Sequence, residues 1–226
     1  MPHITRRTAG LAGLVLAPFW IAIVILVTSL EWDYLHSLGW SLTTENEVNY
    51  PSATLRGDFG LVQTLSFVIT GLLGGVFTVG LRREFRHWIS GWVATAGLGL
   101  FSVGMLLSAV PGDLPPYEPA SWHGTIHDFG FMCFVLSMLV GYSASGLALR
   151  GNPAWRGWRL LGWTPLVLAA VAFTNAGLPG DLGFCLFLAL GLSWYTVMGG
   201  RLFALDRETN AHRRSQLPEA AAPGLL

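Results

Sequence analysis

The sequence contains no lysine, and charged residues of every kind are scarce. All 13 basic side chains are arginines, which excludes Schiff-base chemistry, the lysine of a phosphate-binding loop and a lysine general base. Only 12% of the 226 residues are charged, about half the share found in a typical soluble domain. The formal net charge is zero, so nucleic acid is not an expected partner.

Cysteine is also rare, and the motifs of several enzyme classes are missing. Cys133 and Cys185 lie in apolar runs, which favours core packing over a disulfide or a metal pair. The chain has neither a G-x-S-x-G nor an H-E-x-x-H motif. No ionisable residue falls in the middle of a predicted membrane span, so a proton relay or ion path has no side chains to use. These absences argue against a pump, a channel or a secondary transporter.

Apolar residues, by contrast, make up 52% of the chain, and the mean hydropathy is +0.52. A membrane helix needs about 20 mostly apolar residues. Six segments meet this requirement: 8–30, 59–81, 89–110, 125–149, 160–178 and 182–205. The sequence therefore predicts an all-α polytopic membrane helix bundle of six spans, forming one domain over 1–205. Residues 206–226 are predicted to be a cytoplasmic tail.

The arginines are distributed unevenly between the two sides of such a bundle. Twelve of the 13 fall on one side, and only Arg56 falls on the other. The positive-inside rule then predicts a multi-pass cell-membrane protein with both termini in the cytoplasm. Nine of the 13 acids lie on the predicted outer side or at its boundary: Glu31, Asp33, Glu45, Glu47, Asp58, Asp113, Glu118, Asp128 and Asp181. Because acids contribute little to topology, this second bias needs its own explanation.

Two connections on the predicted outer side are rich in polar residues. The first, 31–57, is too long for a bare link, and we expect a lid or a short interfacial helix there. The second, 111–128, contains four prolines and leads into the fourth span with His123, His127 and Asp128. Imidazoles four residues apart share one face of a helix, which is the spacing of two ligands to one metal ion.

A site can be predicted from these residues. Asp58, Asp113 and Asp181 lie at a similar predicted depth to the two histidines. His123, His127 and Asp113 would form a zinc site with an open position for water. The predicted catalytic residues are Asp58, Asp113, His127 and Asp128.

Two kinds of enzyme fit this set, both acting on a membrane lipid. In the first, metal-activated water attacks an amide, ester or phosphoester. In the second, no metal is needed, and Asp58 or Asp113 acts as a general acid on an isoprenoid or other lipid double bond. The second requires burial to raise the pKa of the carboxyl group.

A structural interpretation remains open beside the enzymatic one. Asp58, Asp128 and Asp181 stand at helix N-termini, where the helix dipole and free N–H groups favour an acid. In that case the Asp/His network only shapes a surface that binds a lipid head group or an unknown partner protein. Small residues have a structural explanation too, since the pairs Gly71/Gly75 and Gly141/Ser145 have the spacing of close helix packing.

Three short motifs resemble those of bacterial and archaeal integral membrane proteins grouped as domain of unknown function 998. His36-Ser37-Leu38-Gly39 is similar to the family's Ser-x-Leu-Gly element. Val110-Pro111-Gly112-Asp113 is similar to its Phe-Pro-x-Asp, with valine in place of phenylalanine. His123-Gly124 through His127 is similar to its Gly-x-x-His. The resemblance covers roughly 8–205. It implies six spans and an outer cluster at Asp113 and His127, and it implies no established reaction.

Overall fold

The computed structural model describes residues 4–42, 50–114, 118–158, 160, 163–164, 167 and 182–215. The secondary structure of these residues is helical, without strands. The long helices are α1 (Arg6–Leu30), α3 (Gly60–Leu81), α4 (Trp88–Leu107), α5 (Trp122–Leu136) and α8 (Leu182–Ser215). The shorter elements are α2 (Trp32–Ser37), η1 (Ser52–Arg56), η2 (Arg82–Glu84), the π-helix η3 (Ser137–Tyr142), α6 (Ser143–Ala148) and η4 (Pro153–Trp155).

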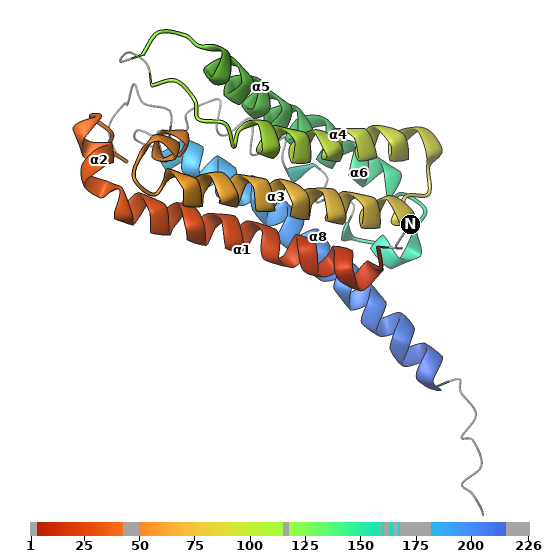
Figure 1. Ribbon diagram of the computed structural model, residues 1–226. Coiled ribbons are helices and arrows are strands. Elements are labelled where there is room, and N and C mark those ends of the chain that lie inside the picture. The colour runs from red at the N-terminus through yellow and green to blue at the C-terminus, as the bar shows by residue number, and fades with distance from the viewer. Residues whose placement is uncertain are drawn as a thin grey trace, which may run out of the picture.

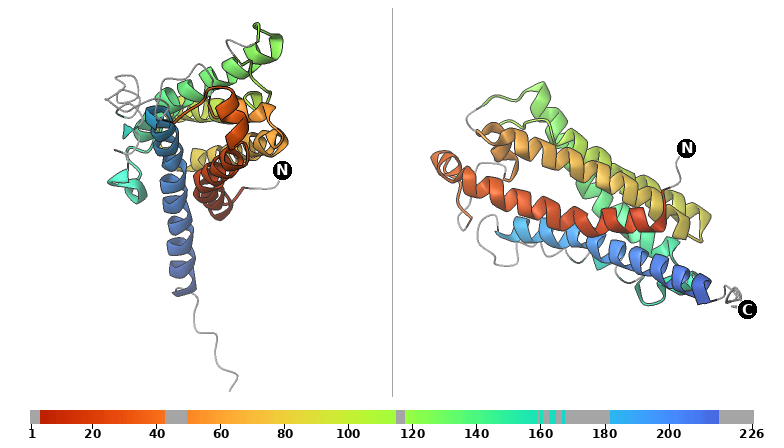
Figure 2. Two further views of the ribbon diagram at one scale, coloured as in Figure 1. Left: turned by 90° about the vertical axis from the view of Figure 1, so that its left-hand side faces the viewer. Right: turned by 60° about the horizontal axis from the view of Figure 1, so that its bottom comes forward.

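The long helices form an elongated bundle (Figure 1). Helix α1 packs against α3 and α8, and α4 packs against α3, α5, η3 and α6. One end of the bundle carries α2, η1 and the connection between α4 and α5, and we call it the loop end. The opposite end carries the start of α1 and the turn between α3 and α4, and we call it the arginine end. Helix α8 projects beyond the other helices at the arginine end (Figure 2).

The predicted all-helical fold is confirmed, and so is the multi-pass membrane character. Within the described part of the chain, five helices are long and apolar enough to cross a membrane. They correspond to the predicted spans 8–30, 59–81, 89–110, 125–149 and 182–205. The predicted span 160–178 falls mostly outside the described residues. Helix α8 continues to Ser215 and so extends into the predicted tail. The cytoplasmic placement of the termini stays a prediction.

The surface of α3 shows why this bundle belongs in a membrane. Its exposed side carries Leu61, Leu65, Ile69, Leu72 and Val79. Its buried side is built largely from small and polar residues together with two phenylalanines. A soluble helix has the reverse arrangement, with its apolar stripe inward and its polar face in water. An apolar outer surface is stable in hydrocarbon, where small residues let helices approach closely.

Glycines mark the closest approaches between helices. A Cβ atom built on Gly97 of α4 would lie 2.6 Å from the Cα atom of Gly141 in η3. A Cβ atom on Gly104 would lie 2.7 Å from the carbonyl oxygen of Gly130 in α5. The predicted packing role of Gly141 is therefore confirmed. A Cβ atom on Gly75 would have only one neighbour, 3.6 Å away, so this glycine is not a point of closest approach.

The first polar connection covers the loop end, as expected, with short helical segments. Leu35 of α2 is fully buried in a small apolar cluster with Trp40, Ala53 and Leu114. Tyr50 stacks on Trp40 with ring centroids 4.6 Å apart. These contacts fix η1 over the end of the bundle.

Arg56 is the one arginine that the sequence places at the loop end, and it has a structural function there. Its guanidinium donates to the Gly112 carbonyl oxygen at 3.1 Å and to the Glu118 carboxylate at 2.9 Å. It therefore ties η1 to the connection between α4 and α5.

Candidate functional site

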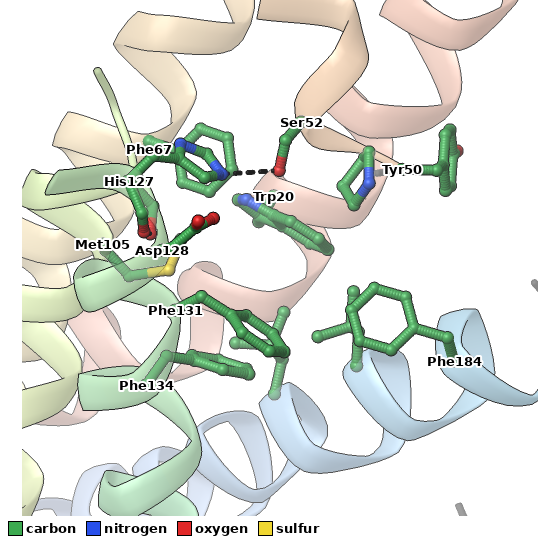
Figure 3. Close-up of a pocket in the computed structure, with 14 residues that line it drawn as sticks. Trp20, Tyr50, Ser52, Phe67, Met105, His127, Asp128, Phe131, Phe134 and Phe184 are labelled. Carbon is green, nitrogen blue, oxygen red and sulfur yellow. Dashed lines mark hydrogen bonds between the residues drawn. The ribbon is translucent and has the colours of Figure 1, made fainter. Parts of the chain in front are cut away.

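A cavity of about 320 Å³ lies between the helices near the loop end. It is lined by Trp20, Tyr50, Pro51, Ser52, Phe67, Met105, Ser108, His127, Asp128, Phe131, Phe134, Phe184, Leu188 and Leu192. Figure 3 shows that these residues are segregated. Ser52, His127 and Asp128 lie toward one side, whereas the rings of Phe131, Phe134 and Phe184 lie toward the other. The cavity is therefore amphipathic.

His127 is the central polar group of this cavity, and it is only 5% exposed. Its Nδ1 lies 2.7 Å from the Val110 carbonyl oxygen, and its Nε2 lies 2.8 Å from the Ser52 hydroxyl. A carbonyl oxygen only accepts hydrogen bonds, so Nδ1 must carry the proton. In the neutral ring Nε2 is then the acceptor, and the Ser52 hydroxyl donates to it (Figure 3).

Ser52 reaches His127 because η1 is held from several sides. The Thr54 hydroxyl donates to the Pro51 carbonyl oxygen at 2.7 Å, and Leu55 is buried in the main core. The buried Glu31 carboxylate, at the end of α1, accepts the Phe59 N–H at 2.5 Å. Glu31 thereby satisfies a free N–H group at the start of α3 and fixes the segment that follows Ser52.

Trp20 of α1 contributes a further polar group to the cavity wall. Its side chain is 5% exposed, and its ring meets that of Phe67 edge-on, with centroids 6.2 Å apart. Its Nε1 is buried and has no hydrogen-bond partner among the described residues. A buried donor without a partner costs about 1–3 kcal/mol, so this N–H favours any ligand that brings an acceptor.

Asp128, a predicted catalytic residue, lies at the rim of the same cavity. It follows His127 on α5, and its side chain is exposed while also lining the hollow. Figure 3 shows its carboxylate on the same side as Ser52 and Trp20. The structure thus brings His127 and Asp128 together at one cavity.

Asp113 and His123 form a separate group that caps α5. The Asp113 carboxylate accepts the Ser121 amide N–H at 2.8 Å and the Ser121 hydroxyl at 2.6 Å. The Ser121 hydroxyl in turn accepts the Gly124 N–H at 3.1 Å. The His123 Nδ1 lies 3.1 Å from the Pro111 carbonyl oxygen and 3.5 Å from the Asp113 carboxylate. This geometry matches the structural interpretation of Asp113.

The pKa of Asp113 is shifted in the direction opposite to the one that acid catalysis by this residue needs. The hydrogen bonds from the Ser121 hydroxyl and the Ser121 amide hold the pKa below its ordinary value of 3.8. Burial acts in the opposite direction and raises the pKa, and the neighbouring charges of His123 and Arg56 lower it by smaller amounts. A general acid at neutral pH needs the opposite shift.

The lowered pKa leads to a prediction about acid stability. The folded state holds the Asp113 carboxylate more tightly than the unfolded chain does. Its contribution to stability is therefore complete above the ordinary pKa of 3.8 and is lost as pH falls through the lower folded value. We expect the wild-type thermal midpoint in detergent to fall more than that of Asp113→Asn between about pH 7 and about pH 3. Parallel pH curves for the two proteins would contradict this role.

Of the three predicted zinc ligands, the structure brings Asp113 and His123 together, with His127 in different surroundings. Among the described residues, no group of three or more His, Cys, Asp or Glu side chains could hold a metal ion. His123 and His127 share a helix as predicted, yet His123 faces Pro111 and Asp113, whereas His127 faces Val110 and Ser52.

The two remaining predicted aspartates are Asp58 and Asp181. Asp58 is exposed just before α3 and does not line the cavity. Asp181 lies outside the described residues.

The family described as "Protein of unknown function (DUF998)" matches residues 11–201. The chain belongs to this family. No curated protein and no solved structure matches the chain. The family membership suggested by the sequence motifs is thus confirmed. Within this DUF998 protein, Asp113 and His127 have different surroundings.

Sequence reasoning did not find three residues of this DUF998 site. Trp20 lies within an apolar run, where a tryptophan is unremarkable, and Glu31 was only one of nine outer acids. Ser52 stands in a polar connection without periodicity, and its bond to His127 joins residues 75 positions apart. The only local signal was Pro51, because a proline within a long polar connection marks a turn.

Proposed function

We propose that this DUF998 protein binds a membrane lipid in the cavity near its loop end. The observation that carries the proposal is the amphipathic lining of a hollow of about 320 Å³ within a membrane bundle. Ligand sites are mostly apolar hollows with a few placed polar groups, and this volume is at the small end of their range. The hollow suits one chain and part of the head group of a lipid.

The lining also supports an orientation for the lipid. The polar part would lie beside Ser52, His127 and Trp20, and the chain would lie against Phe131 and Phe184. The unpartnered Trp20 N–H would then donate to a head-group oxygen. A lipid is favoured over a partner protein because these groups line a hollow between helices, which is the usual form of a small-ligand site.

Native mass spectrometry of the detergent-purified protein tests the proposal through co-purified lipid. Leu188 of α8 lines the cavity and is 6% exposed, whereas Leu190 on the same helix is 49% exposed and does not line it. In Leu188→Trp the larger indole fills part of the cavity that the lipid would occupy. We expect Leu188→Trp to lose about 1.4 kcal/mol of binding free energy for the lipid, which lowers its affinity roughly tenfold. Leu190→Trp, the matched control, should keep its lipid.

Equal lipid occupancy in Leu188→Trp and Leu190→Trp would contradict a ligand in this cavity. So would the absence of bound lipid from the wild-type protein. The thermal midpoint of each variant checks that Leu188→Trp is folded when its lipid content is measured.

A further inference from the structure

We propose that Ser52 is a nucleophile and His127 its general base, and that together they transfer the acyl group of a lipid carboxylic ester. The inference rests on the proposed lipid-binding function and adds a reaction at the same site. The sequence contains no G-x-S-x-G motif, so the arrangement is visible only in three dimensions.

The first support is the hydrogen-bond chain through His127. A serine hydroxyl becomes a useful nucleophile when an adjacent base removes its proton, and the base must be held in the correct tautomer. Here the Val110 carbonyl fixes the proton on Nδ1 at 2.7 Å, which leaves Nε2 free to accept from Ser52 at 2.8 Å. The backbone carbonyl takes the orienting position that a carboxylate has in other arrangements of this type.

The second support is that Ser52 lines the cavity and is not sealed in the core. Ser52 is partly exposed, His127 is buried, and both line the cavity. A substrate in the cavity would therefore lie beside both the hydroxyl and its base. By contrast, the buried Ser66 and Ser145 hydroxyls donate to the backbone carbonyl oxygens of Gln63 and Gly141, three and four residues earlier in the chain.

The third support is the unpartnered Trp20 N–H in the same cavity. Attack on an ester turns its carbonyl oxygen into an oxyanion, and a fixed donor stabilises that charge more in a dry site than in water. Trp20 supplies such a donor, and none of the described residues accepts a hydrogen bond from it. In this proposal the Trp20 indole N–H therefore donates a hydrogen bond to the ester carbonyl oxygen.

The reaction balances without a cofactor. The Ser52 Oγ forms a bond to the ester carbonyl carbon while its proton passes to the His127 Nε2. Collapse of the oxyanion breaks the bond to the alcohol oxygen, which takes the proton from Nε2 and leaves. Water or a second alcohol then attacks the acyl-serine and gives its proton to the His127 Nε2. The bond between the acyl carbon and the Ser52 Oγ breaks, Oγ takes that proton back, and the acid or new ester departs.

The charges at the cavity favour a carboxylic ester over a phosphoester at the reacting position. None of the described residues that line it is an arginine, and the chain has no lysine. Asp128 at the rim adds a negative charge, which would repel a phosphate. A neutral carbonyl needs only the single donor that Trp20 provides.

A fluorescent alkyl fluorophosphonate, which reacts with activated serines by losing fluoride, tests the proposal on the full chain in detergent. We expect the wild-type protein to be labelled on Ser52, as located by peptide mass mapping. Ser52→Ala should lose the label, and His127→Gln should react at least about a hundredfold more slowly, in line with the loss of a general base. Ser37→Ala is the control, since Ser37 is exposed in α2 and donates only to the Tyr34 carbonyl oxygen. It should be labelled like the wild type.

Mapping the label on the wild-type protein decides the question even when a variant fails to fold. A label on Ser52 supports the dyad, and no label, or a label elsewhere, overturns it. An unlabelled wild type that still carries lipid in native mass spectrometry overturns only the dyad. A labelled Ser52 in a protein without bound lipid overturns the lipid-binding proposal and leaves the nucleophile.

Discussion

Gly97→Ala should destabilise the bundle strongly, whereas Gly99→Ala, two residues away on α4, should not. The new Cβ atom on residue 97 would lie 2.6 Å from the Cα atom and 2.7 Å from the amide nitrogen of Gly141. Both are backbone atoms of η3, so no side-chain rotation relieves the contact. Helices α4 and η3 must separate, and overpacking of this kind costs about 3 kcal/mol.

The thermal midpoint in detergent measures this effect. A loss of about 3 kcal/mol lowers the midpoint of a chain of this size by roughly 6–12 °C. A Cβ atom on Gly99 meets nothing within 4 Å, so Gly99→Ala should stay within about 1 kcal/mol of the wild type. Equal midpoints for the two variants would show that α4 and η3 are not in backbone contact.

The same contact shows what the sequence could and could not predict. Apolar runs encode spans because the bilayer requires about 20 apolar residues, so α1, α3, α4 and α8 were predictable from local composition. The π-helical turn at η3 had no such signal. It lies where Gly141 meets Gly97, and the pairing of two glycines far apart in the chain depends on tertiary packing.

The candidate site, too, was only partly predictable from the sequence. The helical spacing of His123 and His127 was predictable, and so was their position at the start of a span. The different surroundings of the two histidines were not predictable, because they depend on which backbone carbonyl oxygen each ring contacts. Val110 and Pro111 are neighbours in sequence, yet one orients His127 in the cavity and the other faces His123 beside the α5 cap. The partner of His127 comes from η1, whose packing over the loop end is a tertiary property.

Glu84→Ala should be the most destabilising single change at the arginine end. The Glu84 side chain is 2% exposed and holds three donors from separate segments. It accepts from the Arg6 Nε at 2.6 Å, the Trp155 Nε1 at 3.2 Å and the Asn152 Nδ2 at 3.4 Å. One carboxylate therefore joins α1, the end of α3 and the turn at η4.

Removing that carboxylate leaves the Trp155 Nε1 without its acceptor, and Asn152 Nδ2 keeps only its bond to the Glu84 backbone carbonyl oxygen. Asn152 and Trp155 are both buried, so neither donor gains water in exchange. A buried donor left without its acceptor costs about 1–3 kcal/mol, and the 40% exposed Arg6 adds little because water can replace its partner. The thermal midpoint should therefore fall by about 2–12 °C. Glu208→Ala is the matched control, because Glu208 also pairs with an arginine, Arg201 at 2.9 Å, but its side chain is 59% exposed. That exposed pair should contribute no more than about 1 kcal/mol.

A double-mutant cycle separates the network from a general loss of packing. Asn152→Ala also removes the bond from Asn152 Nδ2 to the Glu84 backbone carbonyl oxygen at 3.0 Å, which does not depend on the Glu84 side chain. If the carboxylate acts through its donors, Glu84→Ala and Asn152→Ala should together cost less than the sum of their separate effects. Additive losses would mean that Glu84 stabilises the end of α3 on its own. The arginine end would then depend on contacts between helices and not on a shared polar centre.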